Sequence, residues 1–247
     1  MARDLQRRRA RERERSFVVE GIRAGEELLR SPLRVRGALF TPGLSSTLRG
    51  AALHAAIVER GLPAQCISEP EMRSAGSTET PQGVVLIAHM PDWSLEALPL
   101  GERVRLLVLD MVQDPGNVGS MLRSAAAFGV AATLALPGTV DLWNGKVVRS
   151  AMGALFHHPA FSVTPSALDA FLRAQKIPLW AADAAGETVD ALPRPTRLAI
   201  VMGNEGSGLS EPVRALTARR VAIPVAPHVE SLNVAVAAGI LLYQLRP

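Results

Sequence analysis

Three polar residues directly precede the apolar segment 234–245. Glu230, Ser231 and Asn233 stand together in the stretch HVESLNVAVAAG. Capping a helix requires only one side-chain acceptor, so a cap does not account for all three. The additional polar groups indicate a functional site at the N-terminal end of that segment.

Two further loops that are polar or rich in glycine follow apolar runs. In LDMVQDPGNVGSMLRS, Asn117 is suited to cap a helix. Gly119 and Arg123 then share one helical face, with room for a ligand or another chain above the glycine. In VMGNEGSGLSEPV, Glu205 lies among glycines that permit close backbone approach, and a helix is expected from Leu209. A capped helix with a surface arginine would also explain the first loop on its own.

The elements that position these loops are short, nearly continuous apolar runs. They are RVRLLVLD, VAATLALP, PLWAAD, RLAIVMG and RRVAIPV. Such runs are typical of parallel strands buried on both faces. Open parallel sheets bind ligands at the carboxyl ends of their strands. Residues 103–247 are therefore predicted to form an α/β domain in which the three loops meet at one edge of the sheet.

A smaller α/β unit is predicted over residues 1–88. Its strands are expected in SFVVE, VRGALF, AQCIS and GVVLIA, with helices near 45–60 and 69–75. The stretch HMPDWSLEALPLGE is polar and contains proline, which predicts a linker over residues 89–102.

Positive charge is concentrated at the N-terminus. Residues 1–15 carry seven arginines against Asp4, Glu12 and Glu14, an excess that equals the net charge of +4. Such a block is either a solvated helix or disordered arm, or it contacts phosphates, which the planar arginine fork suits. The candidate RNA contacts in this block are Arg7, Arg8, Arg9 and Arg11.

Several function classes are disfavoured. No apolar run reaches the roughly 18 residues of a membrane span, and no secretory signal is expected because no apolar core follows the arginines. Cys66 is the single cysteine, which excludes an internal disulfide and fits a reducing cytoplasm. Histidine and cysteine show no metal-ligand spacing. A nicotinamide enzyme is disfavoured by the lack of a strand–GxGxxG–helix unit, and GTVDLWNGKV departs from phosphate-loop spacing.

The three loops together resemble the motifs of the SpoU/TrmH family of SPOUT methyltransferases. The matching stretches are the N-x-G-x-x-x-R pattern from Asn117 to Arg123, then GNEGSGLS, then IPV and ESLNVAVAAG. FVVEG after a basic helix, and TETPQGVV before the linker, resemble the ribosomal-protein-like substrate-binding domain fused to many members. Val225 and Ala235 depart from the family, in which methionine and serine are common at these positions.

The resemblance implies a C-terminal SPOUT domain with a parallel sheet and a deep trefoil knot, preceded by the small substrate-binding domain. It implies a homodimer that transfers a methyl group from S-adenosylmethionine to a ribose 2′-hydroxyl of RNA. Ribosomal RNA is favoured over transfer RNA. The implied cofactor contacts are Ala182, Met202, Gly203, Asn204, Gly206, Ile223, Pro224, Leu232 and Asn233.

The resemblance also assigns the catalytic group to Arg123, with Asn117, Glu205, Ser231 and Asn233 around it. A guanidinium has no acceptor and rarely deprotonates. We therefore expect Arg123 to clamp an RNA phosphate and stabilise developing alkoxide charge, in preference to acting as the base. Two alternatives are compatible with the same motifs: a knotted RNA-binding protein without catalysis, and an RNA base methyltransferase of the same superfamily.

Overall fold

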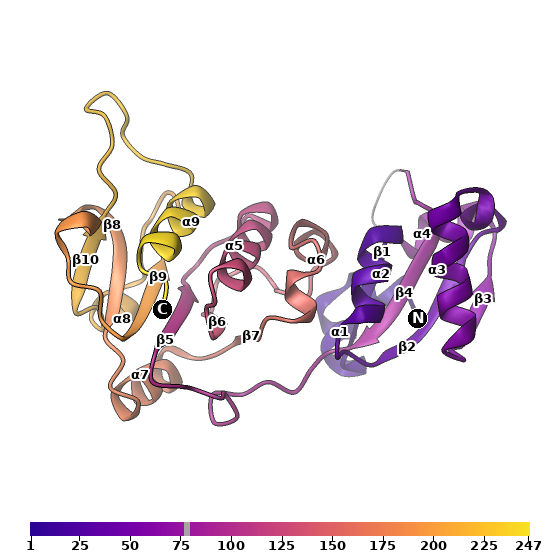
Figure 1. Cartoon of the computed structure of the whole chain (residues 1–247), viewed down its shortest axis with the longest axis horizontal. Helices are drawn as coiled ribbons and strands as arrows, with labels where there is room; N and C mark the ends of the chain where they lie inside the picture. Colours follow the sequence, from indigo (N-terminus) through magenta and orange to yellow (C-terminus); the bar gives the residue numbers. More distant parts are fainter. Residues whose placement is uncertain (77–79) are drawn as a thin grey trace. The chain divides into compact units, whose positions relative to one another are not determined.

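The computed structural model describes residues 1–76 and 80–247, which form two compact units (Figure 1). The first unit comprises Met1–Asp92 and Trp143–His157, and the second comprises Trp93–Leu142 and His158–Pro247. Among the helices described, none is long and apolar enough to cross a bilayer.

The first unit is an α/β structure around a four-stranded sheet in the order β1-β4-β2-β3. β4 pairs antiparallel with β1 and β2, and β2 pairs parallel with β3. The strands are β1 (Ser16–Glu20), β2 (Val35–Phe40), β3 (Ala64–Cys66) and β4 (Val84–His89). The helices are η1 (Asp4–Gln6), α1 (Arg8–Glu14), α2 (Ile22–Arg30), η2 (Pro42–Ser46), α3 (Leu48–Glu59), α4 (Glu69–Ala75), α6 (Gly145–Ser150) and η3 (Ala154–Phe156). Thr78 and Glu79, within TETPQGVV, lie outside the described residues.

The arginine-rich segment is built into the first unit. Leu5 is 1% exposed and belongs to a core cluster with Val18 and Met72. Arg11 is 3% exposed, and its Nη1 donates to the carbonyls of Leu5 and Gln6 at 2.8 Å each. The expectations of a solvated or disordered arm, and of RNA contact by Arg11, are therefore corrected. This guanidinium is occupied in holding η1 against α1.

The other three arginines of this segment that were predicted to contact RNA are exposed. Arg7, Arg8 and Arg9 all face solvent. Nε of Arg8 forms an ion pair with Glu12 at 2.7 Å. Because this pair is exposed, it contributes little to stability.

A segment distant in sequence, Trp143–His157, completes the first unit. The ring of Phe17 in β1 lies 4.3 Å from that of Trp143 and 6.0 Å from that of Phe156. Gly153 has a φ of +88°, and a Cβ added there would lie 2.9 Å from Cβ of Glu27. Glycine at this position therefore permits both the left-handed backbone and the close approach.

The second unit contains a six-stranded sheet in the order β10-β8-β9-β5-β6-β7, and all of its pairings are parallel. This confirms the predicted parallel sheet. The strands are β5 (Val104–Leu109), β6 (Ala132–Ala135), β7 (Ala160–Ser162), β8 (Leu179–Thr188), β9 (Arg197–Met202) and β10 (Arg219–Ala222). The helices are α5 (Pro115–Ala127), α7 (Pro165–Ala174), η4 (Val189–Ala191), α8 (Glu211–Arg214) and α9 (Val234–Gln244).

The central strands are buried on both faces, as their continuous apolar runs predict. Every residue of β5 is buried. Helices α5 and α9 pack against each other (Figure 1). The rings of Phe128 and Tyr243 meet edge to face at 5.6 Å, and a Cβ on Gly239 would lie 3.4 Å from Oγ of Ser124.

Three predicted boundaries in the second unit are wrong. Asp114 caps α5 in place of Asn117, because Pro115 occupies the first helical position. The helix after the second loop begins at Glu211, two residues beyond Leu209. Strand β8 extends beyond the predicted run, and its register against β10 jumps from Ala181 to Glu187.

A buried histidine makes the second unit sensitive to acid. His158 is 4% exposed, its Nε2 lies 2.7 Å from Oγ1 of Thr133, and burial lowers its pKa from 6.5 to about 4. The unfolded chain takes up a proton near pH 6.5, whereas the folded chain does not until about pH 4. Stability from the neutral imidazole is therefore present above pH 6.5 and is lost as the pH falls toward 4.

We predict that His158→Gln flattens the pH dependence of the free energy of unfolding between pH 6.5 and 4. The pKa difference corresponds to a loss of about 3 kcal/mol in the wild type at the acid end. Urea titrations at several pH values would measure it, with exposed His157→Gln as the control. Equal pH slopes in wild type and His158→Gln would contradict the assignment.

Candidate active site

Three loops meet at the carboxyl edge of the second unit's sheet. The first follows β5 and leads into α5, the second follows β9, and the third runs from β10 to α9. Figure 1 shows the third loop leaving the sheet and returning to α9.

The side chain of Asn117 joins all three loops. Its Nδ2 donates a hydrogen bond to Oε1 of Glu205 in the second loop. Its Oδ1 accepts a hydrogen bond from Nδ2 of Asn233 at 3.0 Å. An amide can donate and accept at once, whereas a carboxylate only accepts. An aspartate at position 117 would therefore not make both hydrogen bonds, although Asn117 does not cap its helix.

Helix caps fix the two ends of this network. Oδ1 of Asp114 accepts from the backbone N–H of Asn117 at 2.7 Å. Oδ1 of Asn233 accepts from the N–H groups of Ala235 and Val236 at 2.9 and 3.2 Å. The predicted role of Asn233 as the start of the last helix is confirmed.

The second loop is a tight turn organised by Asn204. The backbone N–H and carbonyl of Asn204 bond to those of Gly208, each at 2.9 Å. Its Oδ1 accepts from the N–H groups of Gly206 and Ser207 at 3.0 Å, and its Nδ2 donates to the carbonyl of Met111 at 3.0 Å. A Cβ on Gly203 would lie 2.7 Å from the backbone of Gly208, so only glycine fits there.

The motifs gave no indication of Asp110, which holds the far end of the second loop. Its carboxylate is 1% exposed and accepts from the N–H and Oγ of Ser210 at 2.7 and 3.2 Å. The signal available in the sequence was a carboxylate directly after an apolar strand, a position where it must find a partner on burial.

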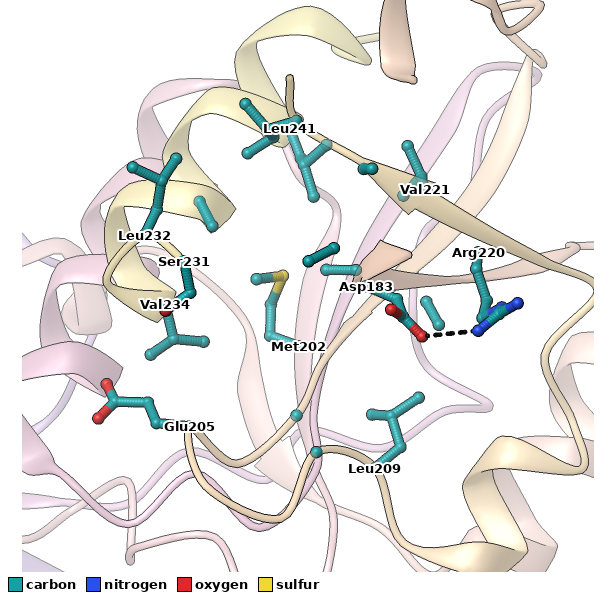
Figure 2. A pocket seen from close by; sticks show the side chains of 18 of the residues that line it. Asp183, Met202, Glu205, Leu209, Arg220, Val221, Ser231, Leu232, Val234 and Leu241 are labelled. Atoms are coloured by element: carbon teal, nitrogen blue, oxygen red, sulfur yellow. Dashed lines mark hydrogen bonds and ion pairs between the residues drawn. The ribbon is translucent and has the colours of Figure 1, made fainter. Parts of the chain in front are cut away.

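A cavity of about 1080 Å³ lies between the second and third loops and the ends of β8 and β10. In Figure 2, Glu205, Ser231 and Val234 lie on one side, Asp183 and Arg220 lie on the other, and Met202 lies between them. Leu209, Leu232 and Leu241 add apolar surface. The mixture of apolar side chains, glycine-rich backbone and a few polar groups is typical of small-molecule sites.

One wall of the cavity comes from an irregular stretch of β8. The bulge after Ala181 brings Ala182 and Asp183 to the lining. Asp183 forms an ion pair with Nη1 of Arg220 at 3.4 Å (Figure 2). Sequence reasoning did not identify Arg220, because a paired basic residue at the start of a strand carries no local signal of a cavity.

The predicted cofactor contacts nearly all gather around this cavity. Those that line it are Ala182, Met202, Gly203, Asn204, Gly206, Ile223, Leu232 and Asn233. Pro224 is exposed and is not among the lining residues.

Only some of the predicted catalytic residues line the cavity. Glu205, Ser231 and Asn233 line the cavity, together with Glu230, and Asn117 is bonded to two of these residues. Arg123 lies on the exposed face of α5, outside the lining, and makes no hydrogen bond or ion pair within the described part of the chain. Ser231 and Glu230 are likewise exposed and unbonded among those residues. The described residues contain no cluster of three metal-ligating side chains.

Comparison with known proteins identifies the two halves of the chain. The SpoU rRNA Methylase family model matches residues 105–243, and the MRM3-like substrate binding domain model matches residues 1–86. The 23S rRNA (guanosine(2553)-2'-O)-methyltransferase RlmP of Bacillus subtilis (strain 168) is 35% identical over 244 residues, which cover 98% of this chain and 93% of that protein.

Two further proteins support the same family membership. The 23S rRNA (guanosine-2'-O-)-methyltransferase RlmB of Salmonella typhi is 32% identical, with coverage of 93% of this chain and 97% of that protein. The solved structure of the SpoU methyltransferase AviRb from Streptomyces viridochromogenes, in complex with the cofactor AdoMet, has a TM-score of 0.87 and 29% identity. It covers 99% of this chain and 94% of that chain. The chain described here belongs to the SpoU rRNA methylase family.

Proposed function

We propose that this protein transfers the methyl group of S-adenosylmethionine to a ribose 2′-hydroxyl of ribosomal RNA. The observation that carries the proposal is the cavity at the sheet edge, where the loops of all three family motifs are joined through Asn117. The named activities of RlmP and RlmB support ribose methylation of 23S rRNA. The AdoMet complex of AviRb supports the cofactor.

We propose that the protein is cytoplasmic and that three segments of the chain divide substrate binding and methyl transfer between them. Residues 1–88 bind the RNA substrate, residues 89–102 link, and residues 103–247 form the methyltransferase domain, apart from Trp143–His157, which pack in the first unit. The last segment of the methyltransferase domain threads a trefoil knot. The family matches over 1–86 and 105–243 support this division.

The cavity suits an adenosyl ligand. Met202, Leu232 and Leu241 offer apolar surface to a base. In the turn from Gly203 to Gly208, the carbonyls of Glu205, Gly206 and Ser207 accept no hydrogen bond from the described residues. When bound, S-adenosylmethionine supplies an electrophilic methyl group on a sulfonium. The loops around the cavity must hold that methyl group in line with the attacking ribose oxygen for the transfer to be fast.

The chain's own residues must position and activate the ribose hydroxyl. The unbonded hydroxyl of Ser231 is available to orient it at the mouth of the cavity. The Glu205 carboxylate keeps one oxygen free of Asn117 and can accept a hydrogen bond from the ribose. The free guanidinium of Arg123 would hold the adjacent phosphate and stabilise negative charge that develops on the attacking oxygen.

Incubating total RNA with methyl-labelled S-adenosylmethionine and the protein tests the proposal. Nuclease digestion and mass spectrometry should find one 2′-O-methylated nucleoside in ribosomal RNA. A label on a base would identify a base methyltransferase. Cofactor binding without label in any RNA would indicate an RNA-binding protein without catalysis.

We predict that Arg123→Ala lowers the methyl-transfer rate by about 10²–10³, as loss of a transition-state charge contact does. Cofactor affinity, measured by calorimetry, should stay within a few fold because Arg123 lies outside the cavity. Arg123→Lys should also be poor, since a point charge does not reproduce the planar fork. A folded Arg123→Ala protein with near wild-type rate would remove Arg123 from the active site.

We predict that replacing Arg7, Arg8 and Arg9 by Gln weakens RNA binding without changing the modified nucleotide. Removing one phosphate contact should lower the salt slope of log affinity by roughly 0.7–0.9. Deleting residues 1–15 is unsuitable, because it removes buried Leu5 and Arg11. An unchanged slope in the folded triple variant would show these arginines to be solvated surface only.

We predict a homodimer whose interface includes α9. Val236 and Tyr243 are 52% and 51% exposed on this apolar helix. A second copy could also bring Arg123, which lies outside its own cavity, to the partner's site. Light scattering should report twice the 26.3 kDa mass of the chain. A monomer at micromolar concentration would contradict this.

Mixing two variants, each altered in one part of the site, tests that sharing of Arg123. Subunit exchange between Arg123→Ala and the cofactor-site variant Asn233→Ala should restore part of the activity if Arg123 acts across the interface. No recovery in verified mixed dimers would assign Arg123 to its own chain's site.

A further inference from the structure

A second cavity of the second unit lies at the opposite edge of the sheet, where β5 and β9 begin. Its volume is about 240 Å³, and four arginines line it: Arg103, Arg105, Arg194 and Arg246. None of the lining side chains carries a carboxylate. Pro247 also lines the cavity.

A buried guanidinium builds this cavity. Arg105 is 3% exposed, and its Nη1 donates to the carbonyls of Val104 and Thr196 at 2.9 and 3.1 Å. Its Nη2 donates to the carbonyl of Pro195 at 2.6 Å, and its Nε donates to that of Leu245. Arg105 therefore ties the segment before β9 to the end of α9. Four acceptors for five N–H groups leave one Nη2 hydrogen without a partner in the described part.

Each segment that Arg105 anchors brings an exposed arginine to the cavity. Arg194 precedes Pro195, and Arg246 follows Leu245. Arg103 and Arg194 make no hydrogen bond or ion pair with the described residues. Arg246 donates to the carbonyl of Tyr243 at 2.5 Å and lies 4.3 Å from the centre of its ring.

These positive charges lack the neutralisation found elsewhere in the same unit. Arg173 pairs with Asp169 at 2.7 Å, and Arg219 pairs with Glu187 at 3.2 Å. In the four-arginine cavity, burial and the charge of Arg103 lower the pKa of Arg105. Clustered like charges repel one another, and an anion in the cavity would relieve that repulsion.

We propose that the four-arginine cavity binds a phosphate group of the RNA backbone, as a second contact remote from the reacting ribose. Arginine forks match phosphate oxygens in pairs, which favours this ligand over a spherical anion. The six residues of β5 span roughly 20 Å, so the contact holds RNA that flanks the target nucleotide. The choice of RNA as the source of the phosphate rests on the proposed function.

Filter binding of deproteinised ribosomal RNA to the full chain, at several potassium chloride concentrations, tests this. The triple variant R103Q/R194Q/R246Q should lower the salt slope of log affinity by roughly 0.7–0.9 for each phosphate that it no longer binds. Its cofactor affinity should equal that of the wild type. R194Q alone should lower the slope, whereas the matched control R173Q should not, since Arg173 lies outside this cavity.

An unchanged slope in a folded triple variant would overturn the proposal, as would an equal loss in R173Q. If inorganic phosphate raises the Tm of the wild type only, and the RNA slope is unchanged, the cavity is a free-phosphate site and the RNA contact is refuted. Should the triple variant fail to melt cooperatively, R103Q and R194Q separately decide the matter. Methylation of the same RNA is measured independently, so failure of the enzyme assignment is distinguishable from failure of the phosphate contact.

Discussion

The active-site end of this fold depends on one amide side chain that is used on both of its polar atoms. Asn117 donates to Glu205 and accepts from Asn233, and thereby couples loops that are far apart in sequence. Such hydrogen bonds are modest for overall stability, at about 0.5–1.5 kcal/mol for neutral pairs and about 1.5–3 kcal/mol for charged ones. Their effect is on position, because glycines give the second loop little stiffness of its own.

At each edge of the second unit's sheet, a buried charged side chain holds a neighbouring segment in place. The strands are apolar and buried, so they fix the layers but not the loops between them. Polar side chains at the strand ends fix the loops. Buried Asp110 holds Ser210 at the carboxyl edge of the sheet, and buried Arg105 holds the segment before β9 at the amino edge. Each satisfies backbone groups that would otherwise be costly to bury.

Much of the fold follows from the sequence, because continuous apolar runs predict parallel strands irrespective of tertiary detail. Eight of the nine cofactor contacts that the motifs predict also line the cavity. Local ambiguity caused the error at α5, where Asp114 and Asn117 are both good caps and Pro115 decides between them. The contribution of Arg220 to the cavity and the packing of Trp143 on Phe17 depend on contacts between distant segments. No periodicity encodes such contacts, so these features required the structure.

The most direct test of the coupling through Asn117 is a double-mutant cycle on Asn117 and Glu205, read out as cofactor affinity by calorimetry. If the amide positions the second loop, Asn117→Ala and Glu205→Ala should each weaken binding, and the double variant should lose less than the two effects added. A coupling energy of about 0.5 kcal/mol or more is typical of residues in one hydrogen-bond network. Fully additive effects, or an Asn117→Ala protein that binds the cofactor as tightly as the wild type, would contradict the central role of Asn117.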